Sequence, residues 1–178
     1  MKYLLLLRGI NVGGHHKVVM KELKASLTEI GFTNVISYIN SGNLIFESEQ
    51  AQMIVTQKIK KVLKENYTFP ITMLVISAVD YQQDFSHVPE WWGADPSLRH
   101  NALFMLPNFD LEAVQQLKEQ ITIYDQIELK NQVIFWSSTF KKDFSKSIYS
   151  KLMKASFYKE VTIRNRNTAL KLLQLLQD

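Results

Sequence analysis

The chain has 178 residues, of which 46% are hydrophobic and 21% are charged, and its formal net charge at pH 7 is +4. This composition is typical of a folded globular protein and excludes a disordered or fibrous chain, and the length allows one compact domain or two small halves that share a core. The chain has no cysteine, which excludes disulfide bonds, thiolate nucleophiles, cysteine-ligated zinc and iron–sulfur clusters.

Residues 1–78 have the pattern of a small α+β unit. Tyr3 to Leu7 form a continuous apolar run, which is typical of a strand buried on both faces. The expected elements are a strand at 3–7, a helix at 19–30, a hairpin of strands at 35–39 and 44–46, a helix at 55–63 and a strand at 71–76. This order is that of the split βαβ, or ferredoxin-like, arrangement.

A similar order recurs after a connector at 79–98. The expected elements are a strand at 101–106, a helix at 111–118, a hairpin of strands at 121–129 and 132–136, an amphipathic helix at 144–155, a strand at 161–163 and a final helix bearing Leu172, Leu173 and Leu176. We therefore expect an α+β fold of two ferredoxin-like halves, at 1–78 and 99–178, related by tandem duplication, with an extra C-terminal helix in the second half.

The N-terminal apolar run imitates an export signal but ends at Arg8, which is too early for such a signal. No segment approaches the roughly 20 apolar residues that a membrane span needs. We therefore expect a cytoplasmic protein without a membrane partner.

Positive charge is concentrated in the last quarter of the sequence. Residues 137–178 contain nine Lys or Arg and three acidic residues, a net charge of +6, so the rest of the chain carries −2. Clustered cations raise the local concentration of phosphates, which favours a polyanion as partner. The alternative is a solvated, lysine-rich helix face.

Polar residues gather where the first half is expected to have one edge of its sheet. They are Arg8, Asn11 and Lys17 in the loop after the first strand, and Ser41 and Asn43 in the hairpin. In a split βαβ unit this loop and this hairpin lie at the same edge. A glycine-rich turn before a helix offers backbone N–H groups to an anion, although the glycine spacing here matches neither a Walker loop nor a dinucleotide-binding loop.

These residues also have a purely structural interpretation. The glycines and the hairpin residues would then serve only turn conformations, many of which need a positive φ. A cation that ends a buried run needs a partner, and Glu22 or Glu47 is a candidate partner for Arg8.

A second polar segment precedes the last helix. Asn167 is expected to cap that helix, with Thr168 opening it. Arg164 and Arg166 are two residues apart, on one side of an extended stretch. Cations are unfavourable at a helix N-terminus, so we expect an anion or distant acidic residues to compensate them.

Other kinds of chemistry find little support in the sequence. Neither His-Glu-x-x-His nor Gly-x-Ser-x-Gly occurs, and neighbouring His15 and His16 point apart, so we expect no metal and no cofactor. Trp91 and Trp92 are interpreted as anchors of the connector, with a stacking lid over a base as the alternative.

Three motifs stand in order along almost the whole chain. They are Arg8-Gly9-Ile10-Asn11-Val12-Gly13-Gly14 with Lys17 and Met20, then Tyr38-x-x-Ser41-Gly42-Asn43, and finally Thr162-x-Arg164-Asn165-x-Asn167-Thr168. Together they resemble the domain of unknown function family 1697. The resemblance implies a bacterial, cytoplasmic α+β protein of ferredoxin-like halves with no established activity.

The sequence departs from that family pattern at Arg166, where Trp is common, at His15-His16 and at Val19. The polar set that remains gives the predicted ligand-binding residues: Arg8, Asn11, Lys17, Ser41, Asn43, Arg164, Asn165, Asn167 and Thr168.

The leading functional hypothesis is a binding module for a phosphate-bearing ligand, a nucleotide or a nucleic-acid backbone, in a basic cleft that joins the early and late polar segments. One alternative is a small-molecule enzyme in which Arg8 and Arg164 orient an anionic substrate and His15 or His16 transfers a proton. Another is a structural module whose basic surface docks a partner chain. The sequence predicts no oligomeric state.

Overall fold

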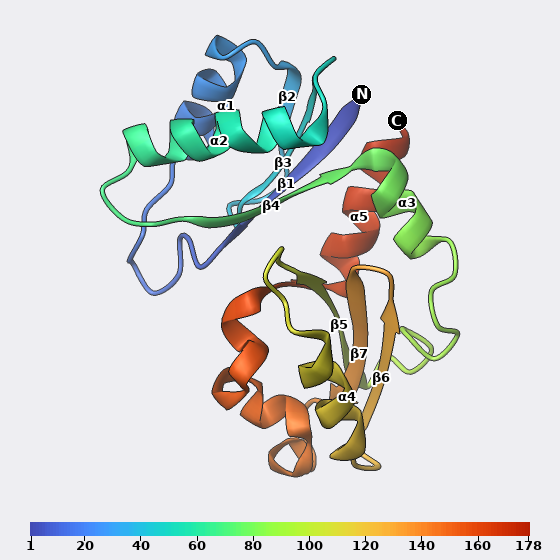
Figure 1. The fold of residues 1–178 in the computed structure, drawn as a ribbon. Helices are drawn as coiled ribbons and strands as arrows, with labels where there is room; N and C mark the ends of the chain where they lie inside the picture. Colours follow the sequence, from blue (N-terminus) through green and yellow to red (C-terminus); the bar gives the residue numbers. More distant parts are fainter. The chain divides into compact units, whose positions relative to one another are not determined.

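A computed structural model of the chain describes residues 1–178, which divide into two compact units. The first unit comprises Met1–Gln82 and Leu172–Asp178, and the second comprises Gln83–Lys171. Each unit contains one four-stranded antiparallel sheet. The α+β class expected from the sequence is therefore confirmed (Figure 1).

The first unit has its sheet in the order β2-β3-β1-β4. Its elements are β1 (Lys2–Arg8), α1 (Met20–Glu29), β2 (Thr33–Ser37), β3 (Asn43–Glu47), α2 (Gln52–Asn66), β4 (Thr72–Ser77) and most of α3 (Ala78–Phe85). Alternate residues of β1 face α1 and α2, and Leu5 stands opposite both Leu44 and Val75 in the sheet. These three side chains are buried with Leu23 of α1 and Ile59 of α2 in the core of this unit. Figure 1 shows α1 and α2 beside this sheet.

The second unit repeats that strand order as β6-β7-β5-β8. Its elements are β5 (Leu98–Met105), α4 (Leu111–Glu119), β6 (Asp125–Lys130), β7 (Val133–Thr139), the 3₁₀ helices η1 (Phe144–Lys146), η2 (Ile148–Lys154) and η3 (Ser156–Glu160), then β8 (Val161–Asn165) and the start of α5 (Arg166–Gln177). Leu103, Ile134 and Trp136 lie on one face of this sheet and pack against α4 and the 3₁₀ segments.

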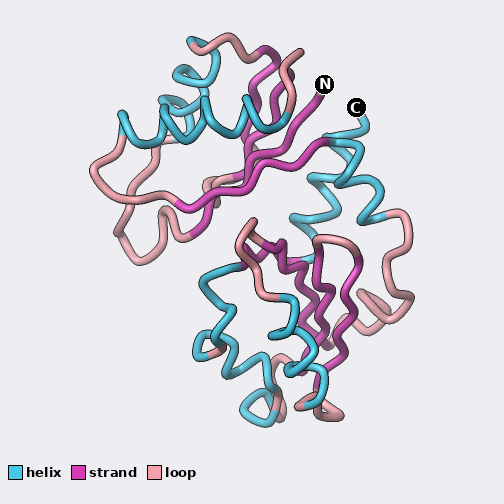
Figure 2. Tube along the Cα trace, in the orientation of Figure 1, coloured by secondary structure: helices cyan, strands magenta, loops and turns pink.

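Most of the expected strands and helices are present, although β6 begins at Asp125, later than the strand expected at 121–129, and β5 begins at Leu98, earlier than the strand expected at 101–106. Three further differences concern helices. The expected connector contains a helix, α3, before the loop that leads to β5 (Figure 2). The expected helix over 144–155 is instead a series of 3₁₀ helices, because Ser147 and Ala155 are extended and interrupt it. The last helix begins one residue before the predicted cap Asn167, and Asn165 supplies the cap: its Oδ1 accepts the Thr168 N–H at 2.9 Å.

Candidate functional site

The early polar loop and the hairpin do meet at one edge of the first sheet. The Asn11 side chain connects them, since its Nδ2 donates to the backbone oxygens of Val18 and Asn40, each at 2.9 Å, and its Oδ1 accepts the Val18 N–H at 2.8 Å. The Leu7 N–H also donates to the Gly42 oxygen at 2.8 Å. This part of the geometric expectation is confirmed, and the amide of Asn11 is largely used in holding the loop.

The other predicted residues of the first unit differ in exposure. Arg8 ends β1 opposite Thr72 and is half-buried, whereas Lys17 and Ser41 are exposed. Asn43 is fully buried, and its Nδ2 donates to the Tyr38 oxygen at 3.0 Å and to Ser41 Oγ at 2.9 Å. Asn43 therefore stabilises the hairpin turn, and the role of this group in ligand binding stays a prediction.

The late polar segment is divided between a strand and a helix. Arg164 lies in β8 opposite Ala102 and is 7% exposed, and its Nη1 donates to Thr162 Oγ1 at 2.9 Å and to the Ile163 oxygen at 2.8 Å. Arg166 begins α5. The expected extended stretch with both guanidiniums on one side is therefore wrong, because β8 ends between them. A shared cleft with the first unit's loop stays a prediction.

A cleft of about 470 Å³ lies where β8 ends beside β5. The pairing of these strands stops at Asn101 and Asn165, so the first residues of β5 have no neighbour on that side. The lining residues, none of them acidic, are Gly93, Pro96, Leu98, Arg99, His100, Phe140, Asn165, Arg166 and Asn167. The volume is within the range of roughly 300–1,000 Å³ that small-molecule sites occupy.

Arg166 brings one positive charge to this cleft. Its Nε donates to the Trp92 backbone oxygen at 3.2 Å, and its guanidinium carbon lies 5.6 Å from the Trp92 ring centroid. Gly93 makes this approach possible: its φ is +103°, and a Cβ there would overlap the Arg166 side chain. The first turn of α5 has no acidic residue, so the guanidinium and the positive end of the helix dipole stand together.

Arg99 brings a second positive charge. Its guanidinium carbon lies 4.4, 5.4 and 5.7 Å from the ring centroids of Phe140, Phe144 and Tyr149. These rings hold the cation without neutralising it. Neither Arg99 nor Arg166 forms a salt bridge with a carboxylate.

His100 fixes the wall of the cleft. Its Nε2 lies 2.7 Å from the Asp95 backbone oxygen, which can only accept, so the hydrogen is on Nε2. Its Nδ1 accepts the Gly93 N–H at 3.2 Å and lies 2.6 Å from Ser137 Oγ. The imidazole therefore ties the 93–95 loop to β5 and β7. The Asp95 carboxylate accepts the Ser97 N–H at 2.8 Å, and hydrogen bonding from Ser97 lowers the pKa of this carboxyl.

One buried amide beside the cleft has no partner in the protein. Asn101 is 5% exposed and its Nδ2 makes no hydrogen bond. Asn101 stands directly opposite Asn165 and two residues from Arg99 on the same face of β5, and both of these neighbours line the cleft. A buried donor without an acceptor is costly, so this position suits a ligand oxygen. Ser138 Oγ, opposite Arg99, is also buried without a partner.

The ligand-binding residues predicted from the sequence do not include several residues that line the cleft, chiefly Arg99, His100 and Phe140. The alternation Arg99, Asn101, Leu103 is a strand signal that extends the predicted strand toward the N-terminus. It would have placed Arg99 on the face of Leu103. The interpretation of Trp92 as an anchor is confirmed: it is 2% exposed, contacts Phe85 and Phe135, and its Nε1 donates to the Asn101 oxygen at 2.9 Å.

The fold and the cleft define a mixed α/β protein with two four-stranded antiparallel sheets and a basic cleft in its second unit. A family model described as "Protein of unknown function (DUF1697)" matches residues 1–135, so the chain belongs to this family, as its motifs predict. None of its helices is long and apolar enough to cross a membrane, and a cytoplasmic location stays a prediction.

Comparison with solved structures agrees with this assignment. The chain is similar to the conserved bacterial protein SP0830 from Streptococcus pneumoniae, with 36% identity, 98% of each chain covered and a TM-score of 0.89. The first two RRM domains of yeast poly(U) binding protein match with 11% identity over 92% of this chain and 98% of that chain. The TM-score of 0.28 is too low to indicate a shared fold. No curated protein matches the chain.

Proposed function

We propose that the protein binds a phosphate-bearing ligand in the cleft between the start of β5 and the start of α5. The observation that carries this proposal is the pair Arg99 and Arg166, two guanidiniums that line one cleft and form no salt bridge. A phosphate group would neutralise both and complement the helix dipole.

The neighbouring hydrogen-bond donors support the same ligand. Asn167 is exposed at the start of α5, and the unpartnered Nδ2 of Asn101 adjoins the cleft. Phosphate oxygens accept several hydrogen bonds at once, whereas an apolar ligand would leave the cations and the buried amide without partners. The cleft therefore favours a doubly or more highly charged oxyanion.

Calorimetric titration with inorganic pyrophosphate at low salt tests the proposal. A charge-assisted hydrogen bond contributes about 1.5–3 kcal/mol, so Arg99→Gln and Arg166→Gln should each weaken binding about tenfold or more. The exposed residue Lys118 lies on α4 and lines no part of the cleft, so Lys118→Gln is the matched control for loss of one charge. Equal affinity in the wild type and in the double arginine variant would refute this assignment, as would the absence of pyrophosphate binding.

The architecture supports a related inference. The sheet orders β2-β3-β1-β4 and β6-β7-β5-β8 are equivalent: in each unit the second strand along the chain is at one edge, followed by the third, the first and the fourth. We infer that the halves are ferredoxin-like and arose by duplication, with the boundaries 1–78 and 99–178 predicted from the sequence. A soluble, folded fragment of residues 1–82 would support this division into halves.

A further inference from the structure

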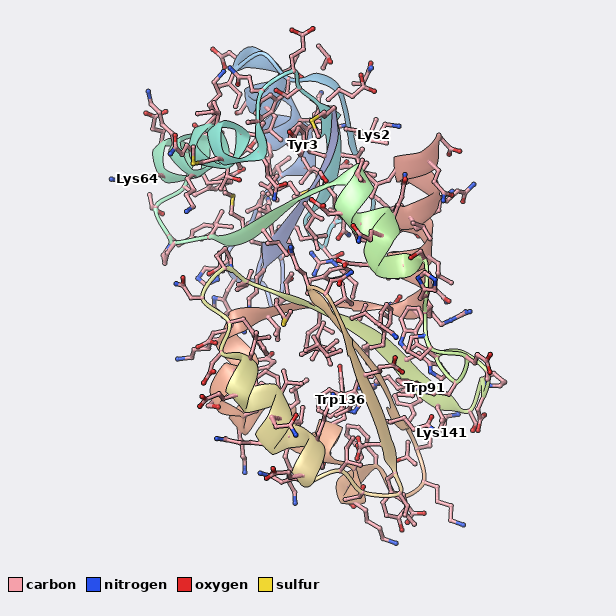
Figure 3. All side chains as sticks on the ribbon, turned by 45° about the vertical axis from the view of Figure 1, so that its right-hand side comes forward. Lys2, Tyr3, Lys64, Trp91, Trp136 and Lys141 are labelled. Atoms are coloured by element: carbon pink, nitrogen blue, oxygen red, sulfur yellow. The ribbon has the colours of Figure 1, made fainter.

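A second cleft adjoins the first in the same unit. It has a volume of about 560 Å³ and shares Pro96, Leu98 and Phe140 with the first. Its other lining residues are Ser97, Thr139, Lys141, Lys142 and Asp143. The Asp143 carboxylate already pairs with Lys146 at 2.8 Å, so the two exposed lysines set the charge of this cleft. Figure 3 labels Lys141 on the segment after β7.

An aromatic ring lies at the junction of the two clefts. Phe140 is 46% exposed although the guanidinium of Arg99 covers part of its ring. Large apolar rings are usually buried in monomeric proteins, as Phe135 and Trp136 are in the preceding strand. An exposed ring between two cationic clefts is the arrangement that single-stranded nucleic acids use, with phosphates on the cations and a base on the ring.

We propose that the natural ligand is a single-stranded nucleic acid, an inference that rests on the proposed function. One phosphate binds at Arg99 and Arg166, the next base stacks on Phe140, and the following phosphate binds at Lys141 and Lys142. A free nucleotide would use only the first cleft and the ring. A duplex keeps its bases stacked inside, so it could not offer one to Phe140. The unpartnered Asn101 amide beside the first cleft is a donor for a phosphate or base oxygen.

Fluorescence anisotropy with a short labelled single strand tests this proposal at several salt concentrations. Affinity should exceed that of a duplex of the same sequence and of a nucleoside monophosphate. Stacking on one aromatic side chain is worth about tenfold or more in affinity, so Phe140→Leu should weaken strand binding by that factor while Phe140→Tyr retains it. Lys141→Gln with Lys142→Gln should reduce the slope of log affinity against log salt by about 0.7 for each phosphate that the variant no longer neutralises.

Pyrophosphate titration of the same variants separates this proposal from the function on which it rests. The double lysine variant should bind pyrophosphate as the wild type does, and Lys118→Gln should leave the affinity for the strand unchanged. Phe140 also holds Arg99 and lines the first cleft, so Phe140→Leu should weaken pyrophosphate binding too, but by a smaller factor than it weakens strand binding. Pyrophosphate binding without tighter binding of a single strand would overturn the nucleic-acid proposal and retain the anion site. An equal loss of affinity for pyrophosphate and for the strand in Phe140→Leu would show that the ring acts only by positioning Arg99, and it would overturn the stacking role. Absence of both kinds of binding would refute both proposals.

Discussion

Asp125 organises the segment that holds Arg99 in place, and replacing it by alanine should destabilise the second unit strongly. The carboxylate is 5% exposed and accepts from the Ser147 hydroxyl at 2.7 Å, Trp136 Nε1 at 3.0 Å, the Ile148 N–H at 2.8 Å and the Thr122 hydroxyl at 3.1 Å. These bonds join β6 and β7 to the 3₁₀ segments that carry two of the rings around Arg99.

The burial of the donors sets the size of the effect. Trp136 and Ser147 are both fully buried, so in Asp125→Ala neither donor can reach water. A buried donor without a partner costs about 1–3 kcal/mol, which gives about 4 kcal/mol for the two. Asp125→Asn keeps one oxygen for these donors but turns an amide NH₂ toward the Ile148 N–H. Its expected cost is therefore smaller, about 2 kcal/mol.

Urea unfolding, followed by tryptophan fluorescence and by circular dichroism, measures these free energies. The matched control is Asp143→Asn, which removes the charge of a carboxylate paired with Lys146 at the surface and keeps a side chain that tolerates the φ of +59° at this position. It should change the free energy of unfolding very little. Pyrophosphate affinity should also fall in Asp125→Ala, because the rings of Phe144 and Tyr149 would no longer be fixed around Arg99. If Asp125→Ala unfolds at the same urea concentration as Asp143→Asn, the reasoning about buried donors is wrong.

Two further predictions concern residues beside the cleft. Gly93→Ala should lower the free energy of unfolding by more than about 1 kcal/mol, because φ at this position is +103°. It should also weaken pyrophosphate binding, because the new Cβ displaces the Arg166 side chain. An unchanged affinity in calorimetry would contradict this prediction. Burial raises the pKa of the Tyr149 hydroxyl, Arg99 partly offsets the rise, and Tyr158 adds to it. The folded state therefore holds this proton more tightly than the unfolded state, so its contribution to stability is complete below about pH 10 and is lost as the pH rises further. Tyr149→Phe should show a smaller loss of stability in alkaline urea titrations, and an unchanged loss would argue against the shift.

Local signals in the sequence are enough to predict most of the elements. The apolar run of β1, the spacing of α1 and α2, and the turn composition of the 40–43 hairpin are such signals, because each reports burial on one face or a preferred turn conformation. The motifs also predict the family. The strand order predicts that the early loop and the hairpin lie close together. The hydrogen bond that the Asn11 side-chain amide donates to the Asn40 backbone oxygen joins them.

The 144–155 segment and the cleft depend instead on contacts between residues far apart in the chain. The spacing of Phe144, Ile148 and Leu152 fits an α-helix, but Asp125 takes the Ile148 N–H and Ser147 turns extended, so 3₁₀ pieces form instead. The cleft requires the pairing of Asn101 with Asn165. Local patterns predict which face of a strand is buried. They do not predict which strand lies beside it or where that neighbouring strand ends. The unpaired edge at the start of β5 therefore depends on the tertiary structure.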